Sequence, residues 1–256
     1  MLRVSKITLS YGAEPVLRGV SLKLEKGQFT SLVGPSGSGK SSLLRVIMGL
    51  QKPEAGLTEM GVGPAEVGIL FQDDALLPWR TASANVALGL RARGVPKREA
   101  LREAERWLGR LGIGGLGGRF PSEMSGGQRK RVALAQVLAL RPKLLLMDEP
   151  FASLDAIVRH RITEDLLQWA ERESLTVLLV THDLEEALAL SDTVHLLSQG
   201  PNARIRESYH VPLPRPRDLL QARTHPLFGA LLKRLWHDLS EEAEGNGKVR
   251  LLRSEA

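Results

Sequence analysis

The sequence contains no cysteine among its 256 residues. Disulfide bonds and metal sites built on thiolates are therefore excluded, as is common for cytoplasmic proteins. No apolar run in the sequence approaches the roughly 20 residues that a membrane-spanning helix needs. The first residues, MLRVSKITLSYG, lack the apolar core of a secretory signal. There are no internal repeats, and we expect a globular protein that does not itself span a membrane.

The formal net charge is +6. A modest positive balance suits nucleotides, nucleic acid or an anionic membrane surface, and it does not choose among them. The length is enough for one large domain or two small ones with a buried core.

Strand patterns dominate the first part of the chain. Residues 2–9 and 20–27 alternate apolar and polar side chains, which predicts an antiparallel hairpin or small sheet. QFTSLVG predicts a short strand, and a helix is expected from Ser41 onward. The apolar face expected for this helix is formed by Leu43, Leu44, Ile47 and Leu50. VGILFQ is a further candidate strand.

Helical patterns replace strands from residue 73 to about residue 141, where we expect a mostly helical insert in an α/β domain. The segments KLLLMDEP and LTVLLVTHD then return as near-continuous apolar runs, which are typical of strands buried on both faces of a parallel sheet. A helix is expected between them, at roughly residues 156–173. SDTVHLLSQG predicts another strand and turn.

A glycine-rich loop lies between the third predicted strand and the first predicted helix. Residues 34–41, GPSGSGKS, match the pattern G-x-x-x-x-G-K-[ST]. The glycines let backbone N–H groups point inward at a phosphate, and the following helix adds its positive end. Lys40 can reach the β- and γ-phosphates, and Ser41 can ligate Mg²⁺. A glycine turn before a helix is the alternative, which the flanking strand and helix make less favourable.

Two carboxylates end the strand LLLM, at Asp148 and Glu149. Ligands bind at the carboxyl edge of such sheets. Asp148 can hold Mg²⁺ through its water shell, and Glu149 can polarise an attacking water. A simple turn is the alternative, and the phosphate loop upstream argues against it.

Three further side chains lie at the ends of predicted strands or of the hairpin. His182 follows a buried strand and can contact a γ-phosphate, although lone histidines are more often structural. Gln72 can orient water or complete a Mg²⁺ shell, although most such glutamines are merely solvated. Tyr11 can stack on a purine, and the alternative is a surface tyrosine in a hairpin.

A second anion-binding device precedes another predicted helix. Ser125, Gly126 and Gly127 offer a hydroxyl, bare backbone N–H groups and a helix N-terminus. This device and the phosphate loop lie on different predicted subdomains. Two chains placed head to tail can bring both to one nucleotide.

From about residue 4 to residue 200, these motifs together resemble the nucleotide-binding subunit of an ABC transporter. In this resemblance Tyr11 is the adenine-stacking aromatic, Gln72 belongs to the coupling loop and His182 is the switch histidine. Residues 124–128 form the signature and residues 153–155 the D-loop. The signature begins with Met124 where leucine is usual, which is a volume-conserving change. Gln136 stands where an arginine is expected.

The resemblance implies an α/β P-loop ATPase core, with a mixed sheet flanked by helices, an N-terminal antiparallel β subdomain and an α-helical insert. It implies Mg²⁺ and ATP as ligands, and a homodimer with ATP between the phosphate loop of one chain and the signature of the other. The expected catalytic residues are Glu149, His182 and Gln72, and the expected metal ligands are Ser41, Gln72 and Asp148. The expected nucleotide contacts are Tyr11, Gly34, Pro35, Ser36, Gly37, Ser38, Gly39, Lys40, Ser41, Ser42, Ser125, Gly126, Gly127, Gln128 and Asp155.

The segment FQDDALLPWRTASANVALGL is similar to the coupling region of importers for nitrate, sulfonates and taurine. The expected partners are transmembrane permease subunits and, indirectly, a solute-binding protein, at the cytoplasmic face of the plasma membrane. No nucleic acid is expected as a partner. Two alternatives stay open, namely an importer of a thiamine-precursor pyrimidine and a soluble ABC ATPase unconnected with transport.

The domain boundaries expected are an ATPase domain at residues 1–200, with its helical subdomain at about 73–141, and a C-terminal extension at 201–256. That extension should be partly helical with a mobile tail. Leucines repeat at helical spacing in HPLFGALLKRLWHDL, with Lys233 and Arg234 beside them. This segment is expected either to pack on its own domain or to form a helix at a membrane surface or with a regulatory role.

Overall fold

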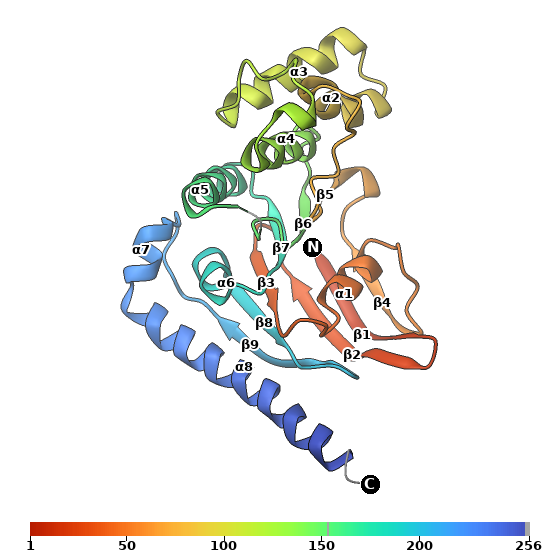
Figure 1. Cartoon of the computed structure of the whole chain (residues 1–256), viewed down its shortest axis with the longest axis vertical. Coiled ribbons are helices and arrows are strands. Elements are labelled where there is room, and N and C mark those ends of the chain that lie inside the picture. The colour runs from red at the N-terminus through yellow and green to blue at the C-terminus, as the bar shows by residue number, and fades with distance from the viewer. Residues whose placement is uncertain (153, 254–256) are drawn as a thin grey trace. The chain divides into compact units, whose positions relative to one another are not determined.

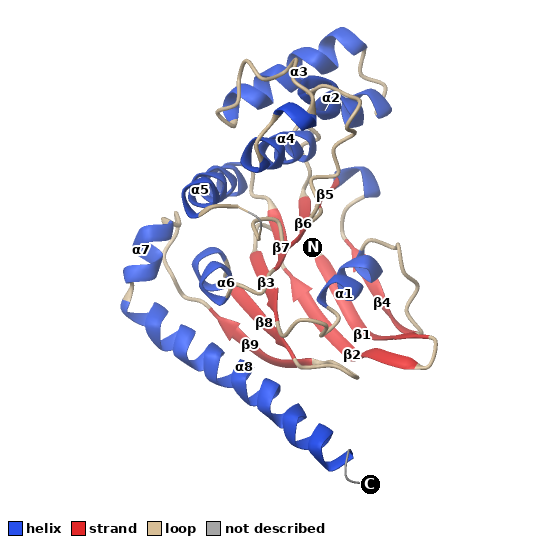
Figure 2. Cartoon of the chain, in the orientation of Figure 1, coloured by secondary structure: helices blue, strands red, loops and turns tan. Residues whose placement is uncertain are grey.

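The computed structural model describes residues 1–152 and 154–253, and it describes side chains as far as Glu242. The chain folds into two compact units. The first unit comprises Met1–Gly61 and Thr176–Ala256, and the second comprises Val62–Leu175. Figures 1 and 2 show the helices and strands of each unit.

The first unit begins with two strands of a hairpin and ends with a long helix. Its elements are β1 (Leu2–Tyr11), β2 (Glu14–Leu24), β3 (Phe29–Val33), α1 (Lys40–Ile47), β4 (Ala55–Met60), β7 (Thr176–Val180), α6 (Leu184–Leu190), β8 (Thr193–Leu197), β9 (Ile205–His210), α7 (Leu219–Thr224) and α8 (Pro226–Arg253). The elements of the second unit are β5 (Val67–Leu70), α2 (Ala82–Ala92), α3 (Lys97–Arg110), α4 (Gly126–Leu138), β6 (Leu144–Asp148) and α5 (Ala156–Arg172).

The predicted N-terminal hairpin is confirmed. Strands β1 and β2 pair antiparallel, and β4 pairs antiparallel with the other edge of β1 (Figure 2). In β1, Leu2 and Val4 are buried, and after an irregularity at Lys6 so are Ile7 and Leu9. This alternation gives the small sheet one apolar face, as the sequence pattern predicts.

A parallel group of strands forms the centre of the first unit. Strand β3 pairs parallel with β7 and with β8, and β9 joins β8 antiparallel. Every residue of β3 and of β7 is buried. The near-continuous apolar run of β7 therefore marks a strand covered on both faces.

Helix α1 is shorter than its apolar pattern predicts. Leu43, Leu44 and Ile47 are buried as expected, but Leu50 is 66% exposed and the expectation for it is wrong. The helix ends at Ile47, and Gly49 has a left-handed φ of 71°. A glycine in the left-handed conformation ends a helix, so Leu50 does not continue the buried face of α1.

The second unit contains the helices α2, α3 and α4, which lie within the predicted helical stretch. Strands β5 and β6 pair parallel beside them. Helix α2 packs on α3 and α4, and α4 also packs on β5 (Figure 1). Ala104, Trp107 and Leu108 form the buried face of α3. The exact subdomain boundaries and the mobility of the C-terminal tail stay predictions.

Helix α8 is tied to strand β9 by polar side chains. The Tyr209 hydroxyl donates a hydrogen bond to the carboxylate of Asp238, and the guanidinium of Arg206 lies 2.6 Å from Glu242 Oε1. Arg206 also pairs with Glu241 at 2.5 Å. Phe228 and Leu235 are buried on the same helix, so α8 packs on its own unit.

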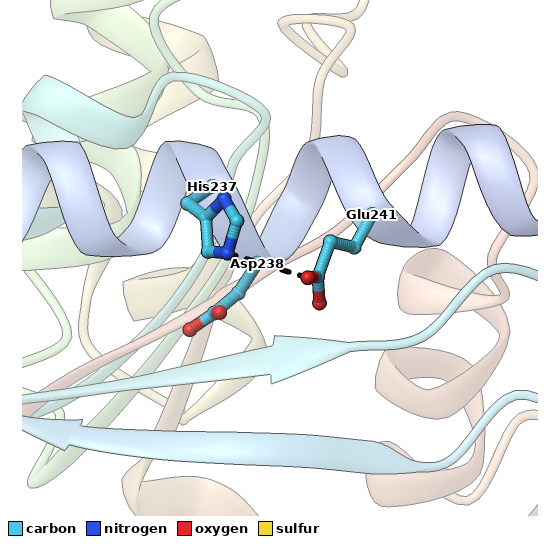
Figure 3. Close-up of side chains that lie close together, drawn as sticks. All are labelled: His237, Asp238 and Glu241. Carbon is cyan, nitrogen blue, oxygen red and sulfur yellow. Dashed lines mark ion pairs between the residues drawn. The ribbon is translucent and has the colours of Figure 1, made fainter.

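The side chains of His237, Asp238 and Glu241 lie close together on α8 (Figure 3). Both carboxylates already have partners, because Asp238 accepts from Tyr209 and Glu241 pairs with Arg206. We therefore assign this cluster to anchoring the helix. No helix in residues 1–152 and 154–253 combines the length and the apolar character needed to cross a membrane.

Candidate nucleotide-binding site

The glycine-rich loop connects β3 to α1, as the sequence predicts. Gly37 and Gly39 have left-handed φ angles of 77° and 95°. A Cβ atom at Gly39 would lie 2.8 Å from side-chain carbons of Val16 and Leu17 on β2. Only glycine fits there, because it combines a left-handed backbone with a close approach to a strand. The curled loop therefore rests directly on the hairpin.

Lys40 is curled back over this loop from the first turn of α1. Its side chain is buried, and Nζ donates hydrogen bonds to the carbonyl oxygens of Gly34 at 2.8 Å and Pro35 at 2.9 Å. A positive charge thus lies within the loop, beside the N-terminus of a helix. Both features attract a phosphate group.

The hydroxyl of Ser38 is a second indication that the loop suits a polyphosphate. Ser38 is fully buried, and among the described residues its Oγ has no hydrogen-bond partner. Ser36 and Gly37 at the tip of the loop are exposed, while Ser41 and Ser42 in the first turn of α1 are half-buried. The loop therefore combines an exposed tip, half-buried hydroxyls and a fixed ammonium group, and these residues fit a nucleoside triphosphate.

Tyr11 ends β1 beside the first turn of α1. Its ring is 43% exposed, and its hydroxyl donates a long hydrogen bond of 3.4 Å to Ser42 Oγ. The hydrogen bond thus holds Tyr11 near the phosphate loop, and its side chain stays partly exposed, as stacking on a base requires.

His182 lies at the same sheet edge as the phosphate loop. Strands β3 and β7 are parallel neighbours, with Leu32 opposite Val180, so Gly34 and His182 follow adjacent strand ends. The His182 side chain is exposed. The next residue, Asp183, caps α6 by accepting a hydrogen bond from Glu186 N at 3.0 Å. This cap fixes the direction in which the chain leaves the strand.

In the second unit, Gln72 and the carboxylates also follow adjacent strand ends. Leu70 of β5 lies opposite Met147 of β6 in a parallel pair, and the chains continue to Gln72 and to Asp148. Asp148 and Glu149 are half-buried, and Gln72 is exposed. Glu149 has a left-handed φ of 43°. A residue other than glycine in this region stores roughly 1 kcal/mol of strain, which proteins often hold at functional positions.

The predicted signature forms the N-terminus of α4. Ser125 Oγ accepts a hydrogen bond from Gln128 N at 3.3 Å, and Gln128 Oε1 accepts one from Ser125 N at 3.0 Å. This reciprocal cap holds the hydroxyl of Ser125 at the mouth of the helix. Ser125 and Gly126 are exposed, as a ligand-binding helix end requires, and Met124 beside them is buried.

The predicted D-loop leads into α5. Asp155 caps this helix by accepting a hydrogen bond from Val158 N at 3.0 Å, so its carboxylate has a structural role in addition to the predicted nucleotide contact. Leu154 is buried. Ser153, the first residue of the predicted D-loop, lies outside the residues that the structure describes.

Lys130 is a residue that the sequence analysis does not single out. Its side chain is buried on α4, and Nζ donates to the carbonyl oxygens of Phe71 at 3.1 Å and Gln72 at 2.9 Å. Burial lowers the pKa of the Lys130 ammonium, and the carboxylate of Asp74 opposes that change. The only sequence signal is a run of three cations, Arg129 to Arg131, which does not reveal which of them is buried.

The site residues thus form two groups, one in each unit. The first unit holds Tyr11, the phosphate loop and His182. The second unit holds Gln72, the signature, the two carboxylates and Asp155.

A family model described as "ABC transporter" matches residues 17–152 of the chain. The taurine import ATP-binding protein TauB of Chromobacterium violaceum is 42% identical over 250 residues, which cover 93% of this chain and 95% of that protein. The nitrate import ATP-binding protein NrtC of Synechocystis is 40% identical over 236 residues, or 88% of this chain. The chain spans 35% of the length of that nitrate relative, which is therefore a much longer protein.

The solved structures include a dimeric ATP-binding cassette in a post-hydrolysis state, bound to ADP and Pi. It matches with a TM-score of 0.74 and 28% sequence identity, covering 84% of this chain and all of the other.

Proposed function

Because the chain belongs to the ABC transporter family and is an ATPase of its ATP-binding cassette type, we propose that it drives uptake of a small solute through a separate membrane permease. The solute proposed is nitrate, a sulfonate, taurine or a similar small molecule. Support comes from the relatives named as taurine and nitrate import proteins. The observation that carries the proposal is the presence, in one chain, of the phosphate loop with its buried Lys40 and of an exposed, capped Ser125.

The first unit supplies most of the proposed contacts to the nucleotide. Tyr11 stacks on the adenine, Lys40 contacts the β- and γ-phosphates, and the loop amides surround the phosphate oxygens. Mg²⁺, when bound, would neutralise charge on these oxygens, and Ser41, Gln72 and Asp148 are the residues proposed to hold it. Oxygen ligands of this kind are the ones that Mg²⁺ prefers, so the donor set fits the ion.

Glu149 is proposed to accept the proton of the attacking water, and His182 to contact the γ-phosphate. A positioned general base contributes about 10²–10⁴-fold to such a reaction. The half-buried position of Glu149 and the exposed position of His182 support these roles, since a base needs shelter from bulk water and a phosphate contact needs access.

Two copies are proposed to enclose two ATP molecules, with Ser125 and Gly127 of one copy facing the phosphate loop of the other. The exposure of Ser125 and Gly126 at the N-terminus of α4 supports this arrangement, because a helix N-terminus attracts a phosphate. The dimeric state named for the similar cassette also supports it. Bound ATP then holds the two copies together, and hydrolysis lets them separate.

A loop in the second unit has the properties of a permease contact. Trp79 is 70% exposed, and Pro78 beside it is also exposed. The fully buried Asn85 fixes this loop, since its side-chain amide donates to the carbonyl oxygens of Leu77, Arg80 and Thr81. A large exposed indole on a rigid loop is a common feature of protein interfaces. A permease partner would place the subunit at the cytoplasmic face of the membrane.

The decisive experiment uses the Glu149→Gln variant with Mg²⁺ and ATP. The variant should bind ATP, form a stable dimer on size-exclusion chromatography and release almost no phosphate. The same variant with ADP is the control and should remain monomeric. A variant that hydrolyses ATP at the normal rate would remove Glu149 from its proposed role.

A soluble ABC ATPase acting on nucleic acid or another complex is the second candidate, and an importer of thiamine-precursor pyrimidines is a third. Stimulation of ATP hydrolysis by a reconstituted permease supports transport. Stimulation by DNA or RNA instead supports the soluble alternative. Identifying the solute-binding protein that copurifies with the permease, and screening it against sulfonates, nitrate and pyrimidines, distinguishes the solutes.

A further inference from the structure

Lys130 is a buried cation whose bonds reach a loop nearly sixty positions earlier in the chain. Its side chain is 1% exposed. Nζ lies 3.1 Å from Phe71 O, 2.9 Å from Gln72 O and 3.4 Å from Asp74 Oδ1. An ammonium group has three N–H bonds, so these three acceptors use all of them. Lysine is almost never buried so completely unless its charge is paired, as it is here with Asp74.

Arg129 forms a second connection between the same two segments. Its Nε lies 3.3 Å from Asp74 Oδ2, and its Nη1 donates to Met124 O at 2.8 Å. Asp74 therefore accepts from two successive cations of α4 with its two oxygens. Through Arg129, the carbonyl of the residue before Ser125 joins the same network.

The network connects the two parts of the second unit that carry the proposed transport function. One part is the segment 71–74, which contains Gln72 and leads toward Trp79. The other is the first turn of α4, where Ser125 caps the helix and Lys130 follows one turn later. Helix α4 also packs on β5, whose end leads into that segment (Figure 1).

We propose that Lys130 is a positioning residue that fixes the coupling loop, residues 71–74, to helix α4, so that Gln72 and Ser125 move as one body. This inference rests on the proposed function, in which the loop faces the permease and the helix faces the second copy. Hydrogen bonds from a charged donor are stronger than those from a neutral donor. The backbone of residues 71–74 is therefore held more firmly than it would be if water were its only hydrogen-bond partner. A displacement of the loop by the permease is then delivered to the signature rather than absorbed by the loop.

The test uses the full-length protein reconstituted with its permease, and it compares Lys130→Met with Lys143→Met. Methionine keeps much of the volume of lysine and removes the donors. Lys143 is an exposed lysine of the same unit, paired with Glu66, and serves as the matched control. Asp74→Asn is the second variant, since it weakens the network without emptying the buried position.

For Lys130→Met we expect stimulation of ATP hydrolysis by the permease to fall about tenfold, while the Kd for ATP changes by less than about threefold. Amide hydrogen exchange of residues 71–74 should become about tenfold faster. Asp74→Asn should show the same changes to a smaller degree, and Lys143→Met should match the unmodified protein.

Stimulation and exchange that match the unmodified protein in either network variant would overturn the proposal. If Lys130→Met fails to fold, Asp74→Asn decides the question by the same two measurements. If the unmodified protein is not stimulated by the permease, the proposed transport function fails. Faster exchange of residues 71–74 in the variants would still support the role of Lys130 in fixing the loop.

Discussion

A Cβ atom on Gly127 would lie 2.6 Å from Cγ1 of Val158, which is closer than two carbon atoms that are not bonded to each other can approach. Gly127 belongs to the signature at the start of α4, and Val158 lies in the first turn of α5. The same turn is capped by Asp155 of the predicted D-loop. The absence of a side chain at Gly127 therefore lets two predicted nucleotide-binding segments pack against each other.

Gly127→Ala should lower the free energy of unfolding by about 1–3 kcal/mol, because valine is stiff and cannot move away without strain. In a Val158→Ala background the same change should cost roughly 1 kcal/mol less, since the clashing methyl groups are gone. Urea unfolding of the four proteins measures this cycle. Gly126→Ala is the control, because its Cβ would meet nothing closer than Arg129 Nη2 at 3.8 Å. Equal costs in both backgrounds would contradict the steric explanation.

Trp79→Ala should leave the thermal midpoint unchanged, because the side chain is largely exposed. It should reduce the stimulation of ATP hydrolysis by the permease at least about tenfold, as expected for an aromatic anchor of an interface. The measurement is ATPase activity with and without permease in proteoliposomes. Trp236→Ala, which removes another exposed indole on α8, is the matched control and should retain full stimulation.

Asn85→Ala tests the support of the same loop. The variant removes donors for three carbonyl oxygens and the acceptor for Leu77 N, so it should cost about 1–3 kcal/mol of stability. Unlike Trp79→Ala, it should therefore lower the thermal midpoint and the stimulation together. A variant that keeps its full stability would contradict the role of Asn85 in supporting the loop.

Tyr11→Ala should raise the KM for ATP by roughly fivefold, which corresponds to about 1 kcal/mol of lost stacking. Tyr11→Phe is the control, since it keeps the ring and loses only the long hydrogen bond to Ser42. Steady-state phosphate release over a range of ATP concentrations separates KM from kcat. A rise in KM for the phenylalanine variant equal to that for alanine would assign the role to the hydroxyl instead.

His195 gives the first unit a defined dependence on pH. Burial lowers its pKa to about 4, against about 6.5 in an unfolded chain. Between these values the unfolded state binds a proton that the folded state does not, so stability falls as the pH decreases. From pH 7 to pH 5 we expect this group to contribute a loss of about 2 kcal/mol.

Urea unfolding at pH 7 and pH 5 measures the total loss of stability. In His195→Leu this loss should be smaller by about 2 kcal/mol, because the contribution of His195 is absent. His210→Leu is a control on the neighbouring strand β9, because its side chain is exposed. An unchanged dependence on pH in His195→Leu would assign the effect to other groups.

Local patterns in the sequence account for much of the fold. The alternation of β1 and the near-continuous apolar runs of β6 and β7 each reflect how many faces of a strand are covered. The phosphate loop can be recognised in the sequence, because its conformation depends on glycines at fixed spacing. The position of Leu50 is predicted wrongly, because a periodic pattern does not reveal that Gly49 adopts a left-handed conformation and ends the helix.

Features that depend on distant partners are not predictable in this way. Helix α6 is buried almost all round, so it lacks the polar face that identifies an amphipathic helix. Lys130 looks like its two cationic neighbours in the sequence. Its burial depends on carbonyl oxygens of Phe71 and Gln72, which only the folded chain brings to it.

The β1–β2 hairpin supports both ends of the proposed ligand. Tyr11 completes one strand, and Val16 and Leu17 of the other strand back the loop at Gly39. The pairing of these two strands therefore fixes the distance between the proposed stacking ring and the phosphate loop. We expect a purine base alone or free pyrophosphate to contact only one of these two places, so the hairpin should favour ligands long enough to reach both.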